Sequence, residues 1–248
     1  MSTSTPPHAL AAGGELPFGD TRFALLRLGP LGLPPETTRF VVPSGDGTIG
    51  TVGSLAMESD HVAEAADTWL EFRRELCADP TVSFLPTDLL DASKRASGRG
   101  RPRLTTRRCL SRSEKRAYRG VFRRGLDAVA TMPGTTPRTA FRRNTPSAQM
   151  TELYLDRLVA AHAQAGTPAV VVVPAKVVRP SWSKANAARV EEDSALMAAL
   201  FPDASPVGLL LEATQFPAYA AFLHEKQHRN ASVLLSRHLP EAVPPVAL

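Results

Sequence analysis

The chain has 248 residues, of which 43% are apolar, and 29 Lys and Arg against 24 Asp and Glu give it a net charge of +5. This length allows a buried core in one large domain or two small ones. It contains no apolar run near the roughly 20 residues of a membrane span, and its N-terminus lacks the features of a secretory signal. Its two cysteines, Cys77 and Cys109, make no disulfide framework. We expect a soluble cytoplasmic protein with unpaired cysteines and no membrane partner.

The first 20 residues are rich in Ser, Thr, Pro and Gly and are typical of a flexible arm. The apolar runs RFALLRL (22–28) and RFVV (39–42) predict strands. A helix is predicted over 59–77, because Ser59 or Asp60 can cap it and its apolar residues share one face. These residues are Val62, Ala66, Trp69, Leu70 and Leu76.

Between these strands and this helix, Gly45, Gly47 and Gly50 match the spacing G-x-G-x-x-G. A dinucleotide site would need a helix N-terminus directly after the glycines, to direct backbone N–H groups at the pyrophosphate. The following residues are β-like instead, and Asp-Gly between β-branched residues is a hairpin turn signal. We therefore predict a β-hairpin here.

Positive charge is concentrated in the middle of the chain. Residues 94–143 hold 16 of the Lys and Arg but only two acidic residues, Glu114 and Asp127, so the segment carries about +14 and the remainder about −9. Residues 91–112 lack apolar periodicity and are expected to form a basic loop. A helix is predicted from Ser111, which forms a capping box with Glu114. On this helix, one side is lined by what we call the arginine ridge: Arg112, Arg116, Arg119 and Arg123.

The C-terminal half predicts alternating helices and strands. Helices are expected at 146–166, 183–201 and 216–239, with Pro217 in the first turn of the last, and strands at 168–178 and 207–213 (VGLLLEA). The fold class is therefore α+β or α/β, a helix-rich single domain with a small sheet. We expect this domain to span 21–240 and to contain residues 94–124, the first and most basic part of the basic segment 94–143, followed by a C-terminal tail at 241–248.

His224, Glu225 and His228 form the pattern H-E-x-x-H on a predicted helix. Two histidines four residues apart can bind Zn²⁺ with the glutamate as general base, and these five residues resemble the zincin metallopeptidases. Lys226 departs from that family, and only 20 residues remain for a third ligand. We interpret the stretch as a solvated helix face and expect no metal, no cofactor and no enzyme activity; a zinc-dependent hydrolase stays an alternative.

A second short pattern, Arg99-Gly-Arg-Pro102, resembles the core of an AT-hook. In an AT-hook, two arginines enter the narrow minor groove of A·T-rich DNA while proline keeps the backbone extended. DNA binding of this type is an alternative function.

Nucleic acid is the partner that the basic segment favours. Fourteen of its 16 basic residues are arginine, which suits bidentate phosphate contact. The loop has no aromatic residue to stack on bases, so we expect mainly backbone contacts. The predicted contact residues are Lys94, Arg95, Arg99, Arg101, Arg103, Arg107, Arg108, Arg112, Lys115, Arg116, Arg119, Arg123 and Arg124.

The chain contains 36 Ala, 22 Pro and 17 Ser. This composition, the basic charge and the size resemble the proline-alanine-serine-rich proteins of polymycoviruses. The resemblance implies a viral, virion-associated protein that associates with or coats a double-stranded RNA genome. We accordingly expect an RNA-binding homo-oligomer.

Overall fold

The structure of the protein is a computed structural model that describes residues 23–29, 34–45, 48–78, 112–174, 179, 181–182, 205–226 and 246–247. The expected arm, most of the basic loop and the predicted helix 183–201 lie outside the described residues. In chain order the elements are β1 (Phe23–Leu28), β2 (Thr37–Gly45), β3 (Ile49–Glu58), the short 3-10 turn η1 (Ser59–His61), α1 (Val62–Ala78), α3 (Arg112–Thr131), β4 (Thr136–Arg143), α4 (Ser147–Ala165), β5 (Ala169–Pro174), α7 (Ser205–Glu225) and β6 (Val246–Ala247).

The described strands form one mixed sheet in the order β1-β5-β2-β3-β4-β6. Strand β5 runs antiparallel to β1 and parallel to β2. Strand β3 runs antiparallel to both of its neighbours, β2 and β4, and β6 runs parallel to β4. The sheet mixes hairpins with crossovers, and the helices cover both of its faces. The prediction of an α+β single domain is confirmed.

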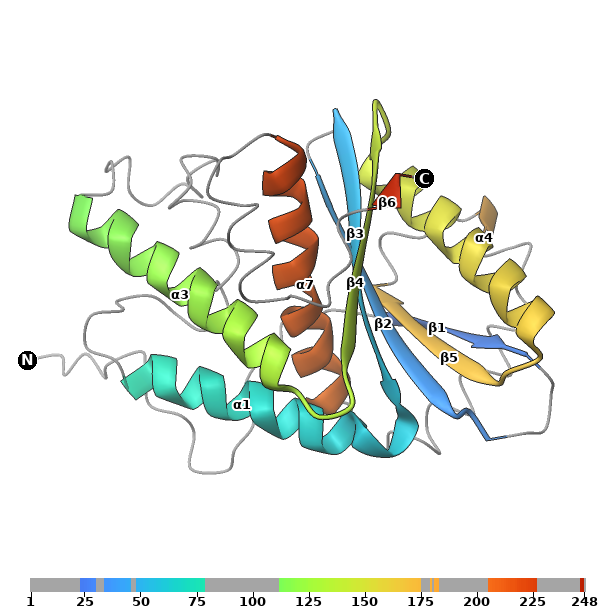
Figure 1. Cartoon of the computed structure of the whole chain (residues 1–248), viewed down its shortest axis with the longest axis horizontal. Helices are drawn as coiled ribbons and strands as arrows, with labels where there is room; N and C mark the ends of the chain where they lie inside the picture. The colour runs from blue at the N-terminus through green and yellow to red at the C-terminus, as the bar shows by residue number, and fades with distance from the viewer. Residues whose placement is uncertain are drawn as a thin grey trace, which may run out of the picture.

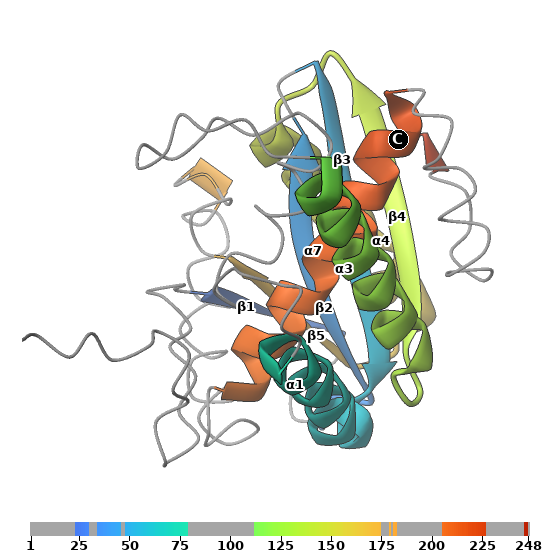
Figure 2. The same ribbon diagram turned by 90° about the vertical axis from the view of Figure 1, so that its left-hand side faces the viewer.

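Each face of the sheet has its own apolar cluster, because side chains alternate along a strand. On β3, Leu55 belongs to the larger cluster, which it shares with α1, α3 and α7. Val52 lies three residues earlier and therefore points to the opposite face of the strand. It belongs to the smaller cluster under α4, together with Met150 and Tyr154. Figures 1 and 2 show the resulting layers: α7 lies against the sheet, α1 and α3 lie outside α7, and α4 covers the opposite face.

The sequence correctly predicts β1, the β2–β3 hairpin, α1, α3, α4 and β5, with small differences at their ends. The prediction of a strand at 207–213 is wrong, because these residues are the first half of α7. Pro217 accordingly lies inside that helix rather than in its first turn. Val246–Ala247, expected in a tail, pair with β4 as β6. Among the described helices, none is long and apolar enough to cross a membrane.

Candidate nucleic-acid interface

Helix α3 is held on the core by one apolar face. Val121, Phe122 and Leu126 are buried, and the Phe122 ring stacks on that of Phe216 in α7, with 5.6 Å between their centroids. Gly125 faces the same ring, since a Cβ at this position would lie 2.3 Å from Cε1 of Phe216. This close approach fixes the rotation of α3 about its axis and therefore decides which residues face outward.

The described side chains of the arginine ridge are exposed. Arg116, Arg119 and Arg123 follow one another at intervals of three and four residues, so they share one side of α3 over two turns. None of the three makes an ion pair within the described part of the chain, and Arg124 beside them is half-exposed. No described carboxylate therefore occupies the guanidinium groups of Arg116, Arg119 and Arg123.

The other predicted contact residues are not placed by the structure. Arg112 and Lys115 lie in the first turn of α3, but their side chains are outside the described residues. The loop residues are outside them altogether: Lys94, Arg95, Arg99, Arg101, Arg103, Arg107 and Arg108. The AT-hook alternative at 99–102 falls in this loop and stays a prediction.

Three arginines at the end of the basic segment are separated from α3. Arg138 and Arg142 lie two residues before and two residues after Ala140, so the three side chains point to the same face of β4. Ala140 packs in the cluster under α4. They are exposed on that side of the sheet, opposite α7 and α3. Arg143 points the other way and lies 3.7 Å from Glu225 of α7, measured from Nη2 to Oε2. The basic segment is thus divided between the two faces of the molecule.

Helix α1 carries the opposite charge on its outer face. Glu64, Asp67, Glu71 and Glu75, which we call the acidic stripe, are all exposed and follow one another at intervals of three or four residues. None of these carboxylates makes an ion pair with another described residue. The prediction of this helix rests on its apolar face alone, although the spacing of the stripe is equally visible in the sequence.

The inner face of α1 contributes a buried ion pair. Arg73 is 1% exposed, and its Nη1 lies 3.2 Å from Oε2 of Glu212 in α7. Burial raises the pKa of Glu212 to about 7, and the nearby Arg73 only partly offsets this rise. The pair joins α1 to α7, with Arg73 fully buried and the Glu212 side chain 17% exposed.

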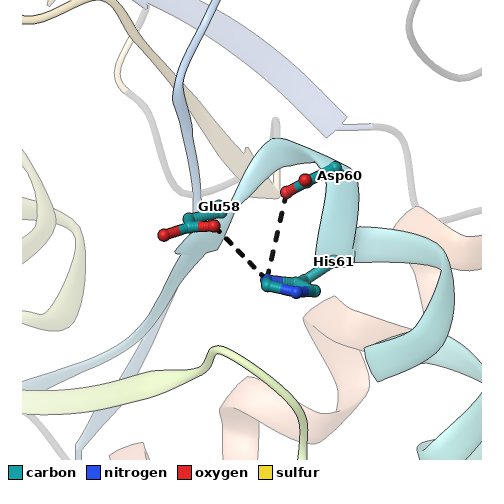
Figure 3. A group of neighbouring side chains, drawn as sticks. All are labelled: Glu58, Asp60 and His61. Carbon is teal, nitrogen blue, oxygen red and sulfur yellow. Dashed lines mark ion pairs between the residues drawn. The ribbon is translucent and has the colours of Figure 1, made fainter.

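Glu58, Asp60 and His61 bring three potential metal-ligand atoms within 4.8 Å of one another (Figure 3). His61 Nδ1 lies 3.7 Å from Oε2 of Glu58 and 3.9 Å from Oδ1 of Asp60. Both carboxylates are exposed, so water can solvate them without an ion. Nothing else in the described residues points to a bound cation, and we assign no metal here.

The H-E-x-x-H pattern is only half described, because His228 lies outside the described residues. Helix α7 ends at Glu225. The Glu225 side chain is 8% exposed and pairs with Arg143, and its Oε1 lies 3.3 Å from Nδ1 of His224. The expected solvated face is therefore wrong for Glu225, whereas the zinc alternative stays a prediction.

The glycine pattern is part of a hairpin. Gly45 pairs with Gly50 at the end of the β2–β3 ladder, and β3 continues without interruption to Glu58. No helix follows these glycines directly, so backbone N–H groups are not arranged for a pyrophosphate. The prediction of a hairpin is confirmed.

Comparisons of the chain with protein-family models, with curated proteins and with solved structures found no match. The likeness in composition to the polymycovirus proteins accordingly stays a prediction.

Proposed function

We propose that the protein binds RNA and coats a double-stranded RNA genome, through the arginine ridge together with the basic residues of 94–108. The observation that carries this proposal is the outward row of Arg116, Arg119 and Arg123, which have no acidic partner among the described residues. Arginines that neutralise phosphates release condensed counterions, and this release favours binding. The planar guanidinium also matches the geometry of phosphate oxygens.

Phosphate contact is favoured over base stacking. Phe122, the described aromatic residue of α3, is buried against Phe216 and is not available to a base. Proteins that bind single strands without sequence preference use exposed aromatic side chains as stacking platforms. Among the described side chains of α3 the arginine row has no such platform, which suits a regular duplex backbone, in agreement with the double-stranded RNA that the polymycovirus resemblance implies.

The test is a gel-shift series with double-stranded RNA, single-stranded RNA and double-stranded DNA at several salt concentrations. The variant Arg116→Gln/Arg119→Gln/Arg123→Gln should weaken binding to all RNA sequences alike. It should also flatten the log–log salt dependence by roughly 2 to 3, since each phosphate contact contributes about 0.7 to 0.9.

The matched control removes the same charge elsewhere. Arg138, Arg142 and Arg157 are exposed on the α4 side of the sheet, so their triple glutamine variant should lose much less affinity. Equal losses in the two variants would mean that net charge, and not the ridge, governs binding. Preferential binding of A·T-rich DNA would favour the AT-hook alternative.

A further inference from the structure

The acidic stripe and the arginine ridge have matching lengths. From Glu64 to Glu75 and from Arg112 to Arg123 the separation is 11 residues in each helix, which is about 16 Å of helix axis. Both rows place a charge on every helical turn. Two helices with these rows face to face would bring unlike charges together along the whole contact.

No contact between these two rows of charge is found among the described residues of one chain. Neither the acidic stripe nor the described part of the arginine ridge makes an ion pair among the described residues. The two helices nevertheless belong to the same outer layer, beyond α7 (Figures 1 and 2). One side of the molecule thus presents an acidic helix and a basic helix, whose outward charged rows have no ion-pair partner among the described residues.

The surface beside the acidic stripe is open. An open hollow of about 800 Å³ runs along α1 and is lined by the stripe and by Thr68, Leu70, Arg74 and Ala78. Leu70 is half-buried, so the hollow offers some apolar contact as well as negative charge. The described lining therefore offers negative charge and some apolar contact to a basic helix from outside the chain.

We propose that a second copy of this chain docks on this side, with the arginine ridge of each copy against the acidic stripe of the other. A two-fold axis makes both contacts at once, because each copy carries one helix of each sign. A second copy of the chain is the partner that fits, because its charged helices are complementary to those of the first. This contact is separate from the proposed RNA binding. Exposed ion pairs are weak singly and are screened by salt, so the dimer should form at low ionic strength.

A charge-swap experiment tests the contact in the absence of RNA. One full-length variant carries Glu64→Arg, Glu71→Arg and Glu75→Arg; the other carries Arg116→Glu, Arg119→Glu and Arg123→Glu. Each variant has two outer helices of like charge and should be monomeric in sedimentation velocity. An equimolar mixture should dimerise, because both contacts between unlike variants again join opposite charges.

The parent should dimerise at about 0.05 M salt and dissociate at about 1 M, where the Debye length falls to roughly 3 Å. Glutamine substitutions at the same positions should weaken the dimer at least about tenfold. These milder variants replace a charge-reversed variant if its far-UV circular dichroism shows that it does not fold. A parent that stays monomeric at low salt would overturn the proposal, as would a mixture that does not associate. Sedimentation reports the dimer independently of RNA, so failure here leaves the RNA proposal standing.

Discussion

At the scale of single residues, the mostly buried carboxyl of Glu212 has a strongly raised pKa. Its partner Arg73 occupies a position that continues the apolar spacing Val62, Ala66, Trp69 and Leu76 on α1. A charge at such a position must be paired to be tolerated in a core. The spacing could therefore have indicated a buried arginine, but the sequence gives no sign that its partner is a glutamate almost 140 residues away.

The raised pKa of Glu212 predicts that stability depends on pH. Between pH 4.5, the ordinary pKa of a glutamate, and about pH 7, the folded protein holds a proton that the unfolded chain has lost. The protonated Glu212 stabilises the folded state by up to roughly 3 kcal/mol. This stabilisation is fully present below pH 4.5 and is lost as the pH rises through about 7. Urea unfolding of the parent and of Glu212→Gln at pH 5 and pH 8 should show this loss in the parent only.

The control for this prediction is Glu71→Gln, which removes an exposed carboxyl from the same side of the molecule. It should leave the pH dependence unchanged. A constant difference in unfolding free energy between the parent and Glu212→Gln from pH 5 to pH 8 would mean that Glu212 ionises normally despite its burial.

At the scale of elements, two glycines of α3 provide a matched test of how this helix is seated. A Cβ at Gly120 would meet no atom within 4 Å, whereas at Gly125 it would lie 2.3 Å from the Phe216 ring. Alanine is favoured over glycine inside a helix by roughly 0.5 to 1 kcal/mol. Gly120→Ala should therefore raise the melting temperature, and Gly125→Ala should lower it because the ring must move. If both variants are stabilised, α3 is rotated relative to the core.

The elements that the sequence predicts are those with a clear period and a capping or turn signal. The hairpin at 45–50 and the helix after Ser111 are examples, and in the latter the 100° spacing also predicts the outward ridge. Strand β4 is missed because Arg138 and Arg142 occupy the positions that face α4, where an apolar residue would mark a covered strand. Helix α7 is misread because the sheet, α1 and α3 surround it, so residues on every side of it are apolar.

At the scale of the whole molecule, the uneven charge of the sequence becomes a spatial arrangement. Part of the positive charge lies on α3 and part of the negative charge on α1, and both helices occupy the outer layer beyond α7. The sequence predicts the positive half of this arrangement from composition and helical spacing. It does not predict that α1 and α3 are neighbours, because this follows from how α7 lies between them and the sheet.

The two proposed partners of the arginine ridge cannot occupy it together. If a second copy covers the ridge, the apparent affinity for RNA falls in proportion to the free fraction of the protein. Neutralising the acidic stripe should then raise RNA affinity by more than its charge change explains. With nine-tenths of the parent dimeric, the gain from lost competition is about tenfold.

We would measure this with the variant Glu64→Gln/Glu71→Gln/Glu75→Gln and double-stranded RNA at low salt. The control, Glu36→Gln/Glu58→Gln/Asp60→Asn, makes the same change in net charge at exposed positions outside the stripe. Both variants should bind more tightly through charge alone, and the stripe variant should gain the additional factor. That additional gain should disappear at protein concentrations below the dimer dissociation constant, where the parent is already monomeric. Equal gains in the two variants at all concentrations would show that dimerisation and RNA binding use different surfaces.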